Sequence, residues 1–120
     1  MAETAQIRSV GNTPVIDLQG KITLGESSTQ VREATDQLLA QGKSRILLNM
    51  SAVPYVDSAG LGAIASCHVK ALGAGGGISL FQVTQRVTEL LKLTRMNEKL
   101  AIFPDEEAAL ASLASQGSNS

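Results

Sequence analysis

Residues 46–65, ILLNMSAVPYVDSAGLGAIA, join a short apolar run to a segment with the features of a helix start. The run at 46–50 is almost continuously apolar, which is typical of a strand buried on both faces, although periodicity alone does not exclude a helix. Farther on, Asp57 and Ser58 supply side-chain oxygens of the kind that cap helices. The stretch therefore predicts a buried strand, a loop and a helix that reaches about Leu72.

Further apolar segments on both sides of this stretch extend the pattern. They predict strands at 7–10, 15–18, 78–81 and 100–103, and helices around 31–38, 84–91 and 106–113. Strands and helices alternate from residue 44 onward, which requires parallel strands joined by right-handed crossovers. The first two strands flank Gly11-Asn12 and predict an antiparallel hairpin. The expected fold is one α/β domain with a mixed sheet, mostly parallel strands and about four helices.

Several residues mark where the helices should begin and end. Thr23-x-x-Glu26 and Ser27-x-x-Gln30 are overlapping capping-box patterns ahead of the first helix, and Gly42 is a stop signal after it. Thr84 is in the position of an N-cap residue for the third helix. The glycine-rich run at 73–77 predicts the end of the second helix and a flexible turn.

Composition bounds the class of protein. The chain has 120 residues, 43% of them hydrophobic and 18% charged, which suits one domain at 5–114 with flexible ends at 1–4 and 115–120. The formal net charge of -1 argues against binding to nucleic acid or to an anionic membrane. Cys67 is the single cysteine, and the N-terminus lacks a basic-then-apolar signal pattern. We expect a soluble cytoplasmic protein.

Two patterns suggest nucleotide or metal binding but do not meet the requirements. Gly42-Lys43-Ser44 has the tail of a P-loop, but Gln37 stands where the motif requires glycine, and the segment leaves a helix instead of a strand. His68 has only Cys67 beside it in the sequence, too few ligands for a metal site. His68 also shares a helical stripe with apolar residues, which indicates a packed or edge histidine. No cofactor and no metal are expected.

A hydrolytic triad of Ser58, His68 and Asp57 fails on geometry. His68 follows Ser58 by almost three helical turns, or roughly 15 Å along the helix axis. The G-x-S-x-G pattern of a nucleophile elbow is also absent, because position 56 is Val56. The sequence therefore indicates no catalytic residue, and we expect a protein that is not an enzyme.

Gly60 and Gly62 lie in the first turns of the predicted helix, where each costs roughly 1 kcal/mol relative to alanine. In a purely structural interpretation, Asp57 or Ser58 caps the helix and the glycines allow close packing of the helix on the sheet. In a functional interpretation, small residues leave the Ser58 hydroxyl accessible to a partner's active site. A phosphate there would add roughly 1.5 to 2 negative charges.

The sequence at 46–62, with its Asp-Ser-x-Gly-Leu-Gly motif, resembles the STAS domain family, and in particular the free-standing bacterial anti-sigma factor antagonists. The segments 20–24, 90–94 and 105–110 also resemble the family, so that the resemblance covers about residues 5–114. It depends mainly on the motif, which is fairly specific when it follows a predicted strand and loop. It implies a STAS-like fold.

The resemblance also implies a partner switch. In similar proteins the serine aligned with Ser58 is phosphorylated by a protein that is both a serine kinase and an anti-sigma factor. The unphosphorylated antagonist binds that protein and frees the sigma factor; the phosphorylated form lets go, and a phosphatase restores it. Nothing in the sequence itself demands a dimer, so a monomer is favoured over an obligate oligomer while the oligomeric state stays open. By this resemblance Ser58 is the phosphoacceptor, and the candidate partner-contact residues are Asp57, Ala59, Gly60, Leu61, Lys21 and Thr23.

Two positions depart from the family pattern. Thr23 stands where many members have an acidic residue, and Asn49 replaces a common aspartate. Thr23 could instead serve as a helix cap. Two alternative functions remain open at this point: a STAS scaffold or signalling module whose partner is not a sigma-factor regulator, and a module that binds a small molecule or nucleotide.

Overall fold

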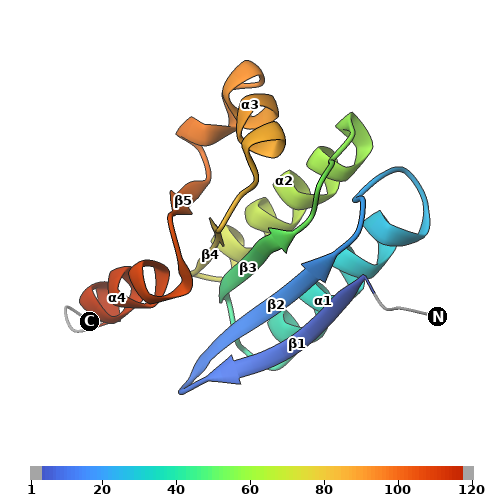
Figure 1. The fold of residues 1–120 in the computed structure, drawn as a ribbon. Coiled ribbons are helices and arrows are strands. Elements are labelled where there is room, and N and C mark those ends of the chain that lie inside the picture. Colours follow the sequence, from blue (N-terminus) through green and yellow to red (C-terminus); the bar gives the residue numbers. More distant parts are fainter. Residues whose placement is uncertain (1–3, 118–120) are drawn as a thin grey trace.

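The central sheet of the computed structural model, which describes residues 4–117, has the strand order β1-β2-β3-β4-β5 (Figure 1). The strands are β1 (Ala5–Val10), β2 (Thr13–Gln19), β3 (Arg45–Ala52), β4 (Gly77–Phe81) and β5 (Ala101–Phe103). The helices are α1 (Glu26–Ala40), α2 (Ser58–Gly73), α3 (Gln85–Leu93), the short 3-10 helix η1 (Met96–Glu98) and α4 (Glu106–Gly117). β1 and β2 pair antiparallel and the other neighbouring strands pair in parallel, which confirms the predicted mixed sheet.

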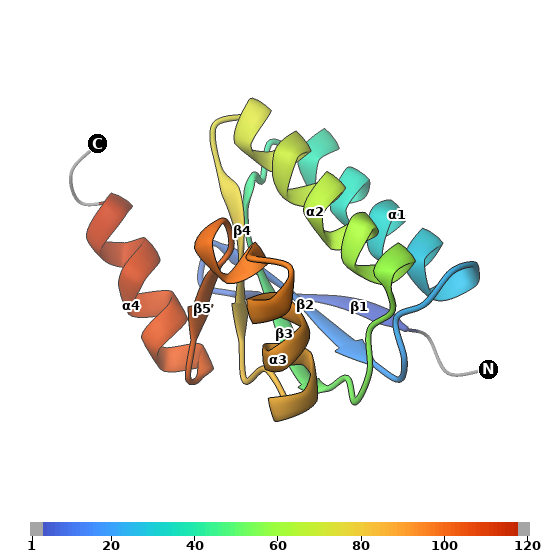
Figure 2. The same ribbon diagram turned by 90° about the horizontal axis from the view of Figure 1, so that it is seen from above.

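The helices form layers on both faces of the sheet. Helices α1 and α2 lie side by side on one face, and α4 covers part of the opposite face near β4 and β5 (Figure 2). The main hydrophobic core fills the space beneath α1 and α2. A smaller cluster lies beneath α4 and consists of Val15, Leu47, Phe81 and Ala109. The predicted α/β architecture is therefore confirmed.

Strand β3 is buried on both faces in its first half, as its apolar run predicts. Ile46 and Leu48 belong to the core beneath α1 and α2, whereas Leu47 between them belongs to the cluster beneath α4. All three side chains are at most 1% exposed. Because successive side chains of a strand point to opposite faces, a strand in the middle of a two-sided layer needs apolar residues at consecutive positions.

The start of α1 differs from the prediction. The helix begins at Glu26 with Gly25 as its N-cap residue, and neither predicted capping box forms. Gly25 has a φ of 111°, a conformation that favours glycine. The Thr23 side chain does not cap the helix. The backbone carbonyl of Thr23 accepts hydrogen bonds from the hydroxyls of Ser27 and Ser28 (3.1 and 2.6 Å). These two serine hydroxyls therefore bond to the turn that precedes α1 and do not cap the start of the helix.

The other predicted boundaries agree more closely with the structure. Gly42 follows α1 with a φ of 79°, as expected of a stop signal. Thr84 is the N-cap residue of α3, although its hydroxyl donates to the Val53 carbonyl (3.2 Å) instead of capping the helix. His68 is a packed histidine whose Nδ1 accepts a hydrogen bond from the Ile78 amide (3.0 Å), and burial lowers its pKa.

The two predicted flexible ends, 1–4 and 115–120, fall partly outside the described residues. Residues 1–3 and 118–120, which belong to the predicted flexible ends, lie outside them. The Thr4 amide donates a hydrogen bond to the Gln30 side chain (2.7 Å). Helix α4 continues to Gly117, beyond the predicted domain end at residue 114. Across residues 4–117, every helix is too short or too polar to traverse a bilayer.

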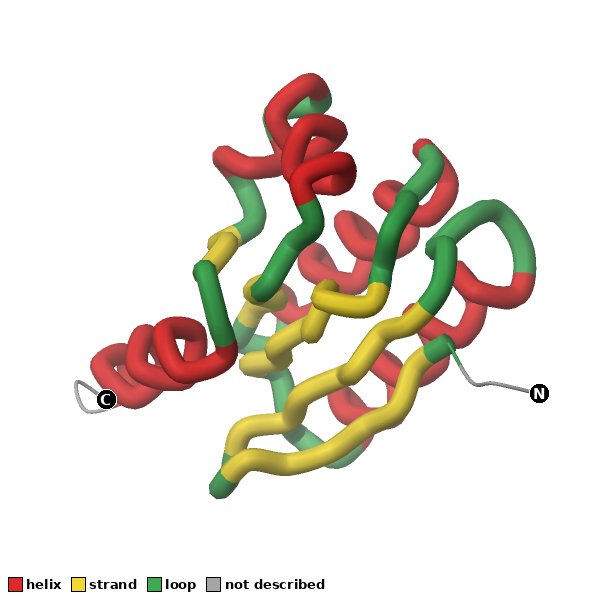
Figure 3. The backbone as a smooth tube through the Cα atoms, in the orientation of Figure 1, coloured by secondary structure: helices red, strands yellow, loops and turns green. Residues whose placement is uncertain are grey.

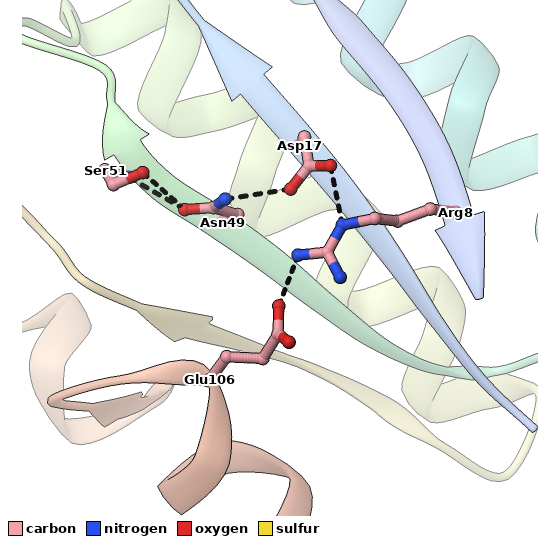
Figure 4. Close-up of polar contacts among 5 residues, drawn as sticks. All are labelled: Arg8, Asp17, Asn49, Ser51 and Glu106. Atoms are coloured by element: carbon pink, nitrogen blue, oxygen red, sulfur yellow. Dashed lines mark hydrogen bonds and ion pairs between the residues drawn. The ribbon is translucent and has the colours of Figure 1, made fainter. Parts of the chain in front are cut away.

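A polar network crosses the sheet face that α4 leaves open (Figure 4). Arg8 of β1 pairs with Asp17 of β2 (2.7 Å) and with Glu106 in the first turn of α4. Asn49 of β3 donates to the second oxygen of Asp17 (2.8 Å) and accepts from the Ser51 hydroxyl (2.8 Å). Burial raises the pKa of Asp17, but the hydrogen bonds from Arg8 and Asn49 outweigh it and hold that pKa below its ordinary value.

Candidate functional site

Ser58 is the first residue of α2 and is exposed at the end of the sheet where the parallel strands terminate. Two loops meet there: residues 20–25, which join β2 to α1, and residues 53–57, which join β3 to α2 (Figure 3). A parallel bridge between Ile22 and Val56 holds the loops together. Functional groups gather at this end of open α/β sheets, and the structure places Ser58 there.

Asp57, and not Ser58, supplies the side chain that caps α2. Its Oδ1 accepts a hydrogen bond from the Gly60 amide (2.7 Å), and its Oδ2 accepts one from the Leu24 amide (3.1 Å). The same carboxylate therefore caps the helix and ties the 20–25 loop to it. This arrangement leaves the Ser58 hydroxyl outside the capping interaction, at the surface.

Gly60 is required by the close approach of α2 to the 20–25 loop. A Cβ on Gly60 would lie 2.0 Å from the carbonyl oxygen of Ile22. That carbonyl cannot easily move, because it accepts from the Asp57 amide (3.2 Å) while the Ile22 amide donates to the Tyr55 carbonyl (3.0 Å). The structural interpretation of the glycines is thus correct in part: Gly60 allows close packing, but onto a loop instead of the sheet.

Gly62 has a different environment. A Cβ at this position would meet nothing within 4 Å, and the residue is exposed. Packing within the described residues does not explain this glycine. It leaves one exposed position on the first turns of α2 without a side chain.

A shallow pocket of about 260 Å³ adjoins Ser58 and is bounded on its far side by α3. The residues that line it are Tyr55, Val56, Asp57, Ser58, Arg86, Glu89, Leu90 and Leu93. The guanidinium carbon of Arg86 lies 5.1 Å from the centre of the Tyr55 ring, within range of a cation–π interaction. Leu93 is 83% exposed, and Leu24 on the other loop is 82% exposed. The surface around Ser58 therefore combines the Arg86 guanidinium with two exposed leucines.

The candidate contact residues divide into surface and buried groups. Ser58 and Lys21 are exposed, and Asp57, Ala59 and Thr23 are half-buried. Gly60 is buried, and Leu61 is 8% exposed and belongs to the main core. The structure brings these residues to one end of the molecule. Gly60 and Leu61 support the surface there from below, but they offer little accessible area to a partner.

Sequence reasoning missed the contribution of α3. The sequence predicted a helix around 84–91, but it did not predict that Arg86 and Leu93 line the pocket beside Ser58. Leu93 is the one feature of the sequence that could have indicated this contribution, because this leucine lies near the helix end and off the apolar face of the helix. Which loop this helix would approach depends on the sheet order and could not be read from α3 itself.

The remaining reactive side chains lie elsewhere. Cys67 is buried, and burial raises the pKa of its thiol. No group of three or more His, Cys, Asp and Glu residues in the described part of the chain could hold a metal ion. The site around Ser58 thus combines an exposed hydroxyl, the Asp57 carboxylate held by two backbone amides, charged side chains from the 20–25 loop and α3, and apolar surface.

The family model of the STAS domain matches residues 4–109, and the chain belongs to this family. Among solved structures, it is similar to the Thermotoga maritima protein TM1081, with 21% identity over 90% of this chain and 92% of that one and a TM-score of 0.83. It is similar to an anti-sigma factor antagonist from Mycobacterium paratuberculosis, with 19% identity over 91% and 92% of the two chains and a TM-score of 0.78.

The unphosphorylated form of the anti-sigma factor antagonist SpoIIAA also matches, with 18% identity over 92% of this chain and 97% of that one and a TM-score of 0.71. SpoIIAA of Bacillus is known in a phosphorylated form as well, which matches with 21% identity over 87% and 95% of the two chains and a TM-score of 0.68. At these identities the likeness establishes the fold, and it confirms the predicted STAS architecture.

Proposed function

We propose that this STAS protein is an anti-sigma factor antagonist whose partner binding is controlled by phosphorylation of Ser58. The observation that carries the proposal is the division of roles between two neighbouring residues. Asp57 caps α2 and fastens the 20–25 loop, and within residues 4–117 no hydrogen bond engages the hydroxyl of Ser58. An exposed hydroxyl with no structural duty suits a phosphoacceptor.

Phosphorylation would change the charge of this surface without breaking the fold. A kinase would transfer the γ-phosphoryl group of ATP to the Ser58 oxygen, while the bond to ADP breaks and the hydroxyl proton passes to a base or to water. The product carries roughly 1.5 to 2 additional negative charges. The dipole at the start of α2 tolerates such charge, so the domain keeps its structure. A partner docked over the same surface meets repulsion and loses contact.

The docking surface extends to both sides of Ser58. Leu24 and Leu93 are its exposed apolar residues, and apolar groups of this kind anchor protein interfaces. Asp57, Ala59, Lys21 and Thr23 remain the candidate contacts from the two loops and α2. Gly60 and Leu61, both buried, would position this surface from below.

The partner in this proposal is an anti-sigma factor that is also a serine kinase. The unphosphorylated protein binds it and releases the sigma factor; phosphorylation ends the complex, and a phosphatase regenerates the binding form. The protein itself acts as substrate and binding module, with no cofactor, and any ATP is bound by the kinase. Similarity to proteins described as anti-sigma factor antagonists supports this assignment.

The proposal is tested by measuring the intact mass of the protein after incubation with candidate anti-sigma kinases and ATP. Wild type is compared with Ser58→Ala and with Ser66→Ala, a control that removes another hydroxyl of α2. We expect one added phosphate on wild type and on Ser66→Ala, and none on Ser58→Ala. If every kinase that binds the protein leaves Ser58 unmodified, the proposal fails and a scaffold function takes its place.

A further inference from the structure

Arg86 is the only cation among the residues that line the pocket beside Ser58. Two carboxylates, those of Asp57 and Glu89, line the same pocket, together with the Tyr55 ring. The Arg86 guanidinium lies over the Tyr55 ring, and Arg86 is exposed. An exposed cation–π contact is a weak interaction, so Arg86 can exchange it for a stronger partner at little cost.

A phosphate on Ser58 would be stabilised by such a cation. Both oxygens of the neighbouring Asp57 carboxylate are held by backbone amides, those of Gly60 and Leu24, and the group therefore cannot turn away from added negative charge. Glu89 is exposed on α3, where solvent screens its charge. Among the residues that line the pocket, Arg86 alone carries a positive charge that can offset the repulsion from Asp57.

We infer that Arg86 is the phosphate-binding residue of the phosphorylated protein and that it leaves the Tyr55 ring to pair with the phosphate on Ser58. This inference rests on the proposed function, which makes Ser58 the phosphoacceptor. A guanidinium binds a phosphate through two parallel charge-assisted hydrogen bonds, which are stronger than a contact with an aromatic ring. Arg86 thereby links the modification on α2 to the position of a side chain on α3.

The exchange has a consequence for partner binding. Leu93 and Arg86 belong to the same helix and line the same pocket. Drawing Arg86 toward Ser58 uncovers Tyr55 and alters the polar surface beside Leu93. Phosphorylation would then change both sides of the docking surface, instead of adding charge at one point.

The experiment uses the full chain with phosphoserine incorporated at position 58 during synthesis. The phosphate is titrated by ³¹P NMR in wild type, Arg86→Gln, Arg86→Lys and Lys92→Gln; the last removes a cation of α3 that does not line the pocket. We expect the phosphate pKa in wild type to lie about 0.5 unit below that in Arg86→Gln, because a nearby cation favours the dianion. Arg86→Lys should keep part of this difference, and Lys92→Gln should keep all of it.

Tyrosine fluorescence gives a second, independent measurement. Tyr55 is the only tyrosine and the chain has no tryptophan, so its emission reports directly on the environment of this ring. Emission should change on phosphorylation in wild type and remain constant in Arg86→Gln. Equal phosphate titration in wild type and Arg86→Gln, or an equal effect of Lys92→Gln, would overturn the inference, as would unchanged Tyr55 emission on phosphorylation.

This outcome is independent of the test of the proposed function. Phosphoserine is present whether or not any kinase recognises Ser58, so failure of the kinase experiment leaves the role of Arg86 measurable. Conversely, a kinase could modify Ser58 and release the partner in Arg86→Gln as in wild type. In that case the partner switch would stand, and the phosphate titration and the Tyr55 emission would still decide whether Arg86 binds the phosphate.

Discussion

The carbonyl oxygen of Ile22 occupies the space that a side chain at Gly60 would need, at 2.0 Å from the position of a Cβ. This contact seats α2 against the 20–25 loop and brings Leu24 within reach of the Asp57 carboxylate. Gly60, the first glycine of the Asp-Ser-x-Gly-Leu-Gly motif, is therefore needed for the structure of the site. It offsets its cost in helix stability by allowing two segments distant in sequence to meet beside Ser58.

Substitution of Gly60 and Gly62 should have opposite effects. Gly60→Ala must displace the Ile22 carbonyl, and we expect it to lower the free energy of unfolding by about 1–3 kcal/mol, as overpacking does. Gly62→Ala meets nothing within 4 Å and should raise it by up to about 1 kcal/mol. Urea denaturation of both variants provides the measurement. Equal effects of the two substitutions would show that the contact with Ile22 does not constrain the helix.

Loss of the Asp57 carboxylate should loosen both the helix and the loop. Asp57→Ala removes the acceptor of two amide hydrogen bonds, and we expect destabilisation of about 1–2 kcal/mol. Hydrogen exchange should accelerate at the Leu24 and Gly60 amides. Asp36→Ala is the control, because Asp36 forms an exposed pair with Lys70 (3.2 Å) and surface pairs contribute roughly 0–1 kcal/mol. An unchanged Leu24 exchange rate in Asp57→Ala would contradict the bridging role.

Asparagine at position 49 fits the polar network better than aspartate would. Asn49 donates a hydrogen bond to Asp17, and a carboxylate in its place would face a second carboxylate on the neighbouring strand. We expect Asn49→Asp to destabilise the protein by roughly 1 kcal/mol at pH 7, since like charges paired across strands are unfavourable. Adding Asp17→Asn to this variant should restore most of the loss. No recovery in the double variant would show that the cost has another origin.

The contribution of Asp17 should depend on pH in the sense set by its lowered pKa. A group whose pKa is lower in the folded state contributes stability above its unfolded pKa of about 3.9, and loses that contribution as the pH falls through its folded pKa. Urea denaturation of wild type and Asp17→Asn at pH 7 and at about pH 2.5 measures it. We expect wild type to be more stable at pH 7, by up to about 1 kcal/mol because Asp17 is partly exposed, and the difference to shrink in acid. A difference independent of pH would contradict this.

The sequence was most informative where the local residue pattern is enough to determine the structure of an element. The apolar residues 46–48 predicted a strand buried on both faces, and the oxygen-bearing pair at the start of α2 predicted a capped helix. Local patterns were less reliable at α1, where Gly25, with its positive φ, starts the helix and the serines bond to the Thr23 carbonyl instead. There the conformation of the turn after β2 determines the residue at which α1 begins.

Features that depend on tertiary placement could not be predicted in the same way. The neighbour of Gly60 is a loop nearly 40 positions earlier in the chain, joined to α2 only once the parallel sheet is formed. The proximity of Arg86 to Ser58 depends on how α3 returns past the β3–α2 loop. Asn49 meets Asp17 through the register of β2 and β3, which the hydrophobic pattern does not specify residue by residue.

The most direct test of the account compares the affinity of a candidate anti-sigma factor for two forms of the full chain. One form carries serine at position 58 and the other phosphoserine, with an otherwise identical sequence. The account predicts tight binding of the serine form and binding at least about tenfold weaker for the phosphoserine form, a difference of about 1.4 kcal/mol or more. Equal affinity of the two forms for a factor that binds the protein would contradict the partner switch at Ser58.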